Sequence, residues 1–246
     1  MIPWIELDRT SLPLGGELRL MRRGHEFSIK LGVAELMTSR QFASEEALAT
    51  LAAEKLKGRA KPRVLIGGLG MGFTLRAALG GFGAGAEIVV AELVPAVVRW
   101  ARGPMADLFG GSLDDRRVEL VEADVAALIR SARPPYDAIL LDVDNGPEGM
   151  TQSANDHLYS MRGLAAARAA LSPGGVLAVW SQGPDRAFAK RLERAGFSVE
   201  DRRVRAGGLH GGSRHVIWLG VPRAGGFQAE STAILRRRPP GASRNP

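Results

Sequence analysis

The 246-residue sequence contains no cysteine, and it has no long run of apolar residues. Without cysteine, the chain has no disulfides, thiolate zinc ligands or cysteine nucleophiles. No apolar stretch approaches the roughly 18 residues needed for a membrane-spanning helix, and the N-terminus lacks the segment order of a signal peptide. We therefore expect a soluble, cytoplasmic protein without a metal site or a membrane anchor.

Positive charge is in excess, but it is concentrated at one end of the chain. The formal net charge is +7, of which five arginines and one glutamate after Pro222 contribute +4 and the preceding body only +3. A segment rich in arginine and proline cannot bury itself, so residues 223–246 are predicted to be disordered. We expect no nucleic-acid partner beyond weak binding through this basic tail.

From Arg63 onward, short apolar runs alternate with helical patterns. Strands are expected at 64–66, 87–91, 118–121, 138–141, 176–180, 197–204 and 215–221, and helices at 73–79, 95–102, 125–131, before 172–175 and at 185–195. Alternating strands and helices predict an α/β, Rossmann-like, doubly wound, mostly parallel seven-stranded sheet. The last two strands have no helix between them, so they predict an antiparallel edge hairpin.

The first sixty residues follow a different pattern. Segments 17–21 and 26–31 alternate like strands, and a helix is expected over 44–57. The sequence thus predicts a small N-terminal β extension with a linking helix over 1–60, a nucleoside-binding Rossmann-like domain over 61–222, and the basic tail over 223–246.

Glycines and acids follow three successive predicted strands. Gly68, Gly70 and Gly72 form a turn where backbone N–H groups can approach a ligand at a helix N-terminus, although such turns also serve packing alone. Glu92 ends the second strand, where a carboxylate can accept hydrogen bonds from ribose hydroxyls. Asp124 follows the third strand and can accept from an adenine amino group or cap a helix. The spacing indicates a nucleoside ligand.

These segments resemble the spermidine synthase (polyamine aminopropyltransferase) family within the class I S-adenosylmethionine-dependent methyltransferase fold. The resemblance rests on the runs 64–72, 91–93, 122–124, 136–142 and 172–177. It implies S-adenosylmethionine or its decarboxylated form as co-substrate. In that family the glycine loop holds the methionine-derived part of the ligand, the acid at Glu92 binds ribose and the acid at Asp124 binds adenine. We add Asp142, after the fourth strand, to the co-substrate-binding residues.

The chain departs from the family pattern at two acids. Met71 stands where the family loop has an aspartate, and Asn145 occupies the place of the acid that deprotonates the attacking amine. The N-terminal helix has Glu45-Glu46-Ala47 where the family tends to show tyrosine, histidine or glutamine, then glutamate. The catalytic candidates are Asp142, Asp144 and Asn145, with Asp144 able to compensate if the loop shifts its register.

The acceptor site is expected around the mouth of the fourth strand. Its candidates are polar or aromatic residues of the following segment, namely Asp142, Asp144, Glu148, Asn155, Asp156, His157 and Tyr159. The alternative interpretation is a polar surface loop that turns at Asn145-Gly146-Pro147, with His157 at a helix start.

Because two polyamine-specific acids are absent, we favour a transferase that moves a methyl group to a small nucleophilic acceptor. A true aminopropyltransferase and a non-catalytic nucleoside-binding protein remain alternatives. A nicotinamide-dependent oxidoreductase would share the glycine loop and Glu92, but Phe73 replaces its third glycine and the edge hairpin argues against it. The expected partner is a small-molecule acceptor, and a homodimer is left open.

Overall fold

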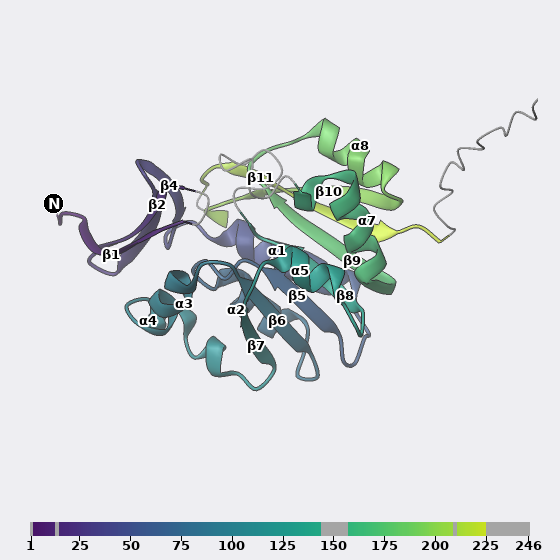
Figure 1. Cartoon of the computed structure of the whole chain (residues 1–246), viewed down its shortest axis with the longest axis horizontal. Coiled ribbons are helices and arrows are strands. Elements are labelled where there is room, and N and C mark those ends of the chain that lie inside the picture. Colours follow the sequence, from purple (N-terminus) through teal and green to yellow (C-terminus); the bar gives the residue numbers. More distant parts are fainter. Residues whose placement is uncertain (1, 13–14, 144–156, 209–210, 225–246) are drawn as a thin grey trace, which may run out of the picture.

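The computed structural model describes residues 2–12, 15–143, 157–208 and 211–224. These residues form two sheets, a smaller N-terminal one and a larger one covered by helices (Figure 1). The tail predicted over 223–246 lies outside the described residues from position 225 onward. The domain boundaries proposed from the sequence stay predictions.

The N-terminal sheet contains four antiparallel strands in chain order. They are β1 (Ile5–Ser11), β2 (Glu17–Arg23), β3 (Glu26–Leu31) and β4 (Ala34–Thr38). The two middle strands were predicted, because their apolar residues alternate and bury one face. The outer strands were missed, because most β1 residues are exposed and β4 has no fully buried residue to give a period-two pattern.

The larger sheet has seven strands in the order β10-β11-β9-β8-β5-β6-β7. In chain order they are β5 (Arg63–Gly67), β6 (Glu87–Glu92), β7 (Val118–Glu122), β8 (Tyr136–Leu141), β9 (Leu171–Ser181), β10 (Phe197–Arg205) and β11 (Arg214–Pro222). Among these strands, β11 runs antiparallel to both of its neighbours, β10 and β9, and all the other neighbouring strands pair in parallel. The predicted mostly parallel sheet with an edge hairpin is confirmed.

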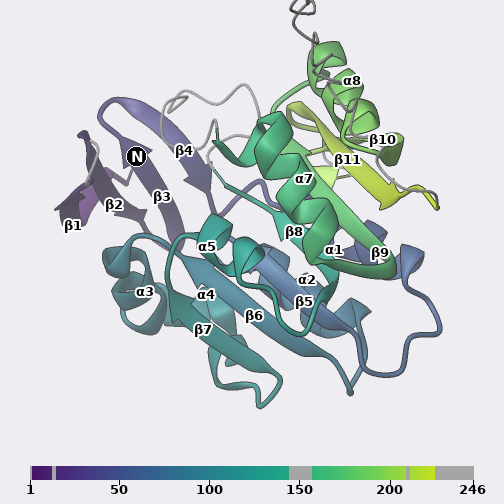
Figure 2. The same cartoon turned by 45° about the vertical axis from the view of Figure 1, so that its right-hand side comes forward.

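Helices cover both faces of the larger sheet (Figure 2). Side chains of β5 alternate between two buried layers, with Val64 and Ile66 in one and Leu65 in the other. The first layer includes α1 (Ala43–Lys55), α2 (Phe73–Gly81) and α3 (Pro95–Arg102), and the second includes α5 (Val125–Arg130), α7 (Met161–Ala170) and α8 (Arg186–Arg194). The short α4 (Ala106–Phe109) and η1 (Ser112–Asp114) were not predicted.

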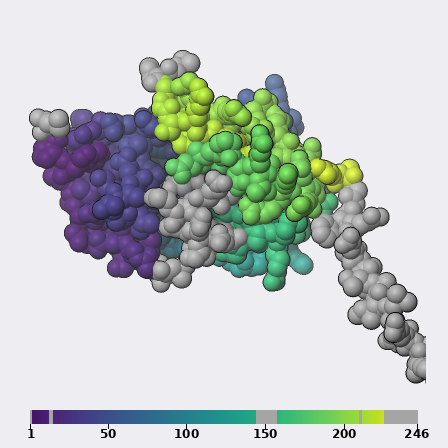
Figure 3. Space-filling model, turned by 90° about the horizontal axis from the view of Figure 1, so that it is seen from above, coloured from purple at the N-terminus to yellow at the C-terminus, as the bar shows by residue number. Residues whose placement is uncertain are grey.

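The N-terminal sheet forms a lobe beside the larger sheet (Figure 3). Two contacts connect the N-terminal part of the chain to the helices of the larger sheet. The Trp100 indole donates a 2.6 Å hydrogen bond to Asp8 of β1, and the rings of Phe42 and Phe73 stack 4.5 Å apart at the starts of α1 and α2. The start of helix α1 therefore lies next to the start of α2.

Three tryptophans lie in the interior. Trp100, Trp180 and Trp218 expose 2%, 9% and 5% of their surface. None of the helices in the described ranges is long and apolar enough to cross a bilayer.

Strand β5 ends at a point where only glycine fits. The Gly68 N–H donates to the Ala91 carbonyl, and the residue has a φ of +93°. A Cβ at position 68 would lie 2.3 Å from the carbonyl oxygen of Asp142. The backbone of β6 and the backbone directly after β8 therefore contact this glycine on opposite sides.

We expect Gly68→Ala to destabilise the fold more than Gly83→Ala. Both glycines have positive φ, but a Cβ at Gly83 would meet nothing within 4 Å. The control variant should lose about 1–2 kcal/mol from backbone strain alone, and Gly68→Ala should lose that plus the cost of displacing the Asp142 backbone. Urea denaturation of both variants measures the difference. Equal free energies of unfolding would contradict a close approach at Gly68.

Candidate functional site

The predicted site residues lie at the carboxyl ends of adjacent parallel strands. One edge of the sheet carries these residues in the order of the strands. They are Asp124 after β7, Glu92 at the end of β6, Gly68 after β5 and Asp142 after β8. Neighbouring strands are about 4.8 Å apart, so three strand spacings span about 14 Å. An extended nucleoside with a substituent on its 5′ carbon can lie along this edge.

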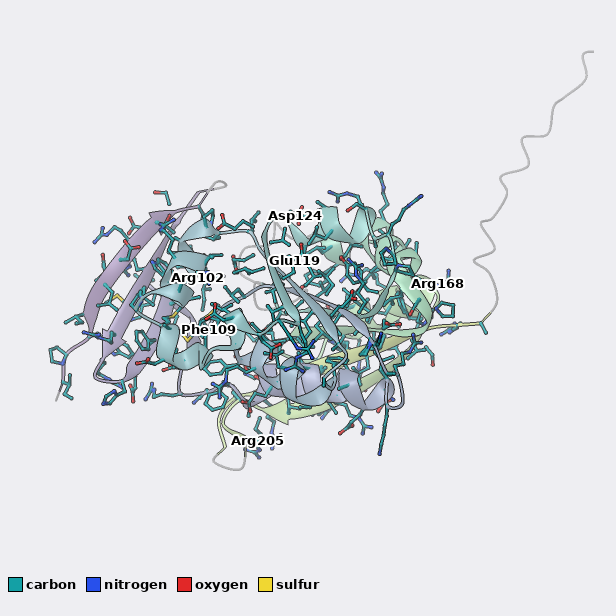
Figure 4. The ribbon with its side chains drawn as sticks, turned by 90° about the horizontal axis from the view of Figure 1, so that it is seen from below. Arg102, Phe109, Glu119, Asp124, Arg168 and Arg205 are labelled. Atoms are coloured by element: carbon teal, nitrogen blue, oxygen red, sulfur yellow. The ribbon has the colours of Figure 1, made fainter. Side chains whose placement is uncertain are left out.

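The three glycines of the turn all have positive φ, but their surroundings differ. Gly68 touches the backbone after β8, as described above. A Cβ on Gly70 would lie 3.3 Å from the Met37 sulfur of β4, and one on Gly72 would overlap the Phe109 ring. Phe109 lies toward the N-terminal sheet in Figure 4. Packing against Phe109 therefore requires glycine at position 72. The glycines of the turn do not all serve the approach of a ligand.

Glu92 at the end of β6 folds back onto the glycine turn. Its carboxylate accepts hydrogen bonds of 2.9 Å from the Leu69 N–H and 2.8 Å from the Val94 N–H. Burial raises the pKa of this carboxyl, while the backbone donors oppose that rise. The backbone N–H groups of Gly70 and Leu93 also act on this carboxylate. Glu92 thus positions the turn, and its role as the ribose acceptor stays a prediction.

An exposed apolar residue follows Glu92. Leu93 exposes 55% of its surface, although it directly follows the buried strand β6. A large apolar side chain beside the ribose acid can pack against a nucleobase. The sequence analysis included Leu93 only in the run 91–93 and not among the site residues, because exposure directly after a buried strand is visible only in the structure.

Asp124 caps α5 and keeps one carboxylate oxygen available. Oδ1 accepts a 2.8 Å bond from the Ala126 N–H, while Oδ2 lies 3.7 Å from Nε2 of His157. The side chain is 38% exposed, and Figure 4 shows Asp124 beyond the strand that carries Glu119. The helix-cap interpretation is therefore confirmed for Oδ1, and adenine binding by Oδ2 stays a prediction. His157 lies at the Asp124 end of the edge, three strands away from Asp142.

Asp142 follows β8 and is held by Thr74 at the start of α2. The Thr74 hydroxyl lies 2.6 Å from Asp142 Oδ2, and the Asp142 N–H donates to the Gly67 carbonyl at 2.9 Å. Burial raises the pKa of Asp142 to about 6, which the Thr74 hydrogen bond only partly opposes. The residue as a whole is half-buried, whereas its carboxyl is desolvated.

Glu45 is a second acid in the same place, and it was not among the predicted site residues. Burial, and then the charge of Asp142, raise the pKa of Glu45 to about 7. Its carboxylate accepts a 2.6 Å hydrogen bond from the Ser44 hydroxyl. The sequence showed two adjacent glutamates in the first turn of a helix, but it gave no indication that this turn meets the end of β8.

The other predicted residues are placed as follows. Asp144, Asn145, Glu148, Asn155 and Asp156 lie outside the described residues. Tyr159 is 4% exposed and packs edge-on against Phe188, and its hydroxyl lies 3.5 Å from the Val143 carbonyl, directly after Asp142. Met71 is 2% exposed within the other core layer, so an apolar contact occupies the place of the family's loop acid. Within the described ranges, no three His, Asp or Glu residues gather as metal ligands.

Comparison with known proteins gives consistent relatives. The chain is 35% identical over 149 residues to polyamine aminopropyltransferase 1 of Streptomyces coelicolor, and 36% identical over 101 residues to the polyamine aminopropyltransferase of Mycobacterium tuberculosis. These matches cover 57% and 40% of this chain but 27% and 18% of the relatives. The chain thus spans about a quarter or less of the length of these relatives. No family model matches it.

Solved structures extend the likeness to the fold. A spermidine synthase in complex with the transition-state analogue AdoDATO matches with a TM-score of 0.70 and 19% identity, covering 89% of this chain and 72% of the other. The spermidine synthase of Thermotoga maritima matches with a TM-score of 0.71 and 19% identity, covering 89% and 73%. The chain resembles the spermidine synthase family in its fold and in part of its sequence. The resemblance inferred from the sequence motifs is confirmed.

The acid pair predicts a pH-dependent stability. Unfolded aspartate and glutamate titrate near pH 4, whereas the pKa values of Asp142 and Glu45 are raised to about 6 and about 7 in the fold. Between these limits the folded state binds more protons than the unfolded chain, so the free energy of unfolding falls as pH rises. Below about pH 4 and above about pH 7 this contribution is constant.

We expect Asp142→Asn to stabilise the protein at pH 8 and to leave it unchanged near pH 4. The amide oxygen can still accept from Thr74, so the variant removes the charge and keeps the contact. The gain should be on the order of 1 kcal/mol at pH 8. Urea denaturation at both pH values measures it, with Asp107→Asn on the exposed side of α4 as the control. Equal shifts at the two pH values would contradict the assignment.

Proposed function

We propose that this protein transfers the aminopropyl group of decarboxylated S-adenosylmethionine to a small amine acceptor. The observation that carries the proposal is the order of Asp124, Glu92, Gly68 and Asp142 along one sheet edge. The relatives named above are polyamine aminopropyltransferases, and the fold shared with spermidine synthases supports the same reaction class.

The donor would lie with its adenine at Asp124 and its ribose at Glu92. Asp124 Oδ2 takes no part in the α5 cap and would accept from the adenine amino group, and the exposed Leu93 follows Glu92 on the neighbouring strand. The sulfonium would then lie over the glycine turn, and its aminopropyl chain would extend toward Asp142. In this pose the reacting carbon and the candidate base share one end of the site.

Asp142 is the proposed general base. The acceptor arrives as an ammonium ion and must lose one proton before its nitrogen can attack. Its lone pair then forms a C–N bond to the carbon beside the sulfonium, while the C–S bond breaks and its electrons pass to sulfur. The products are methylthioadenosine and an alkylated ammonium ion, and the removed proton resides on the carboxylate. A carboxyl with a pKa raised to about 6 is suited to this exchange near neutral pH.

Methyl transfer, which the sequence alone favoured, has weaker support. That preference rested on two positions at which the family has an acid and this chain has Met71 and Asn145. The named relatives are aminopropyltransferases, and two acids at the end of β8 suit a cationic amine better than a neutral methyl acceptor. A non-catalytic nucleoside-binding protein remains the alternative that a product assay would reveal.

The product assay is the direct test. We expect the purified protein, incubated with decarboxylated S-adenosylmethionine and 1,4-diaminobutane, to form methylthioadenosine and the aminopropylated amine, detected together by mass spectrometry. The parallel reaction with S-adenosylmethionine should form no S-adenosylhomocysteine. Formation of S-adenosylhomocysteine instead would restore methyl transfer, and no product from either donor with a range of amines would contradict the proposed activity.

We expect Asp124→Asn to weaken methylthioadenosine binding about tenfold or more, because a lost charge-assisted hydrogen bond costs about 1.5–3 kcal/mol. Asparagine caps helices as well as aspartate does, so α5 should remain intact. Calorimetric titration measures the affinity, and thermal unfolding checks the fold. An unchanged dissociation constant would argue against adenine recognition by Asp124. The matched control is Asp107→Asn, whose side chain lies away from the strand ends.

A further inference from the structure

The two helical layers of the larger sheet differ in charge. In the second layer, the neighbouring helices α7 and α8 contain six basic residues and one acidic residue, Glu193. In the first layer, α1, α2 and α3 together contain four basic and three acidic residues. We call the positive surface of α7 and α8 the basic face (Figure 2). Its residues are Arg162, Arg168, Arg186, Lys190, Arg191 and Arg194.

Most of the basic face lacks negative partners within the protein. Arg191 lies 3.8 Å from the Asp185 carboxylate, and the other five residues form no ion pair with any acid in the described ranges. Four of the six side chains are exposed and two are half-buried. Uncompensated charge of one sign on one surface attracts a ligand that carries many charges of the other sign.

Helix α8 presents part of this charge as a regular row. Arg186, Lys190 and Arg194 are four residues apart and exposed, whereas Phe188 and Leu192 are fully buried against the sheet. At 1.5 Å per residue, the row is about 12 Å long. Duplex DNA carries one negative charge per about 1.7 Å of its axis, so about seven phosphates occupy the same length. A duplex lying along α8 therefore meets the whole row.

Two arginines of the basic face are held in place by packing. The Nε atoms of Arg168 and Arg191 are buried and have no acceptor in the described part of the chain. Arg168 lies across Gly196, where an added Cβ would come within 3.0 Å of Nε, and the Arg191 guanidinium lies 5.7 Å from the centre of the Phe188 ring. The Arg191 side chain still exposes 39% of its surface. A positioned guanidinium loses less freedom when it binds a phosphate.

We propose that the basic face binds the phosphate backbone of duplex DNA without reading its sequence. The proposal does not depend on the proposed aminopropyl transfer. The composition of α7 and α8 favours this ligand over other nucleic acids. Their one aromatic residue, Phe188, is fully buried, so they offer no surface on which the bases of a single strand can stack. They contain no serine, threonine, asparagine or glutamine to contact the 2′-hydroxyls of an RNA duplex.

The basic C-terminal segment begins beside the same face. The Arg223 N–H donates a 2.9 Å hydrogen bond to the carbonyl of Gly196, the residue that Arg168 crosses. The sequence beyond this point includes three consecutive arginines at 236–238. Charge alone in the sequence assigned nucleic-acid binding to this segment. The basic face became visible only in the fold, because its six residues are spread over two helices.

The first test measures how three residues of the basic face contribute to DNA binding. Fluorescence anisotropy follows a labelled duplex of about 30 base pairs and mixed sequence between about 50 and 200 mM NaCl. We expect the triple variant of α8 to raise Kd about tenfold or more at 100 mM NaCl, and to reduce the slope of log K against log[NaCl] by about 2–3. The substitutions are Arg186→Gln, Lys190→Gln and Arg194→Gln.

Two matched triple variants remove the same charge elsewhere in the full chain. One changes exposed residues outside the basic face that form no ion pair in the described ranges, and the other changes the arginines of the C-terminal segment. Both should raise Kd by less than about threefold. Thermal unfolding and methylthioadenosine titration check that each variant folds as the unaltered protein does. The two variants are Lys57→Gln, Lys61→Gln, Arg116→Gln and Arg236→Gln, Arg237→Gln, Arg238→Gln.

Each further outcome supports or overturns the proposal. Two duplexes of unrelated sequence should bind within about twofold of each other, because phosphate contacts do not distinguish bases. Equal weakening by the α8 variant and the Lys57 variant would show that net charge alone acts, and loss of binding in the 236–238 variant alone would return binding to the C-terminal segment. Tighter binding of single-stranded DNA or of an RNA duplex would contradict duplex DNA as the ligand. No binding at 50 mM NaCl would overturn the proposal.

Discussion

The site depends on the close approach of three backbone strands at Gly68. Strand β5 lies between β6 and β8, and the Gly68 amide bonds to Ala91 while its α-carbon lies against the Asp142 carbonyl. A side chain at this position would push β8 away from β5. The absence of one therefore determines how near Asp142 comes to the glycine turn, and hence how near a base at Asp142 comes to a sulfonium above that turn.

From this point the acids along the edge have different environments. Glu92 is buried and hydrogen-bonded by backbone amides, Asp124 is partly exposed and caps a helix, and Asp142 is desolvated beside Glu45. A neutral sugar needs only acceptors, whereas an ammonium ion needs negative charge in a site of low polarity. Burial raises the pKa values of Asp142 and Glu45, and the charge of Asp142 adds to the rise at Glu45.

Helix α1 links the two sheets and also supplies the second acid. It follows β4 of the N-terminal sheet and packs on α2, where Phe42 stacks on Phe73. This contact brings the first turn of α1 to the end of β8. The linking helix of the N-terminal segment thus packs as part of the larger sheet's helical layer.

Much of the fold and half of the site could be predicted from the sequence, because they depend on local order along the chain. Alternating strands and helices determined the parallel sheet, and the strand ends located Gly68, Glu92 and Asp124. The strands β1 and β4 were not predictable, because β1 exposes most of its residues, β4 has no fully buried residue, and neither has a clear period. The proximity of Glu45 to Asp142 could be decided only by the tertiary structure, because the two residues are far apart in the sequence and meet through the packing of α1 on α2. Their raised pKa values follow from that proximity and from burial, neither of which is encoded in a local pattern.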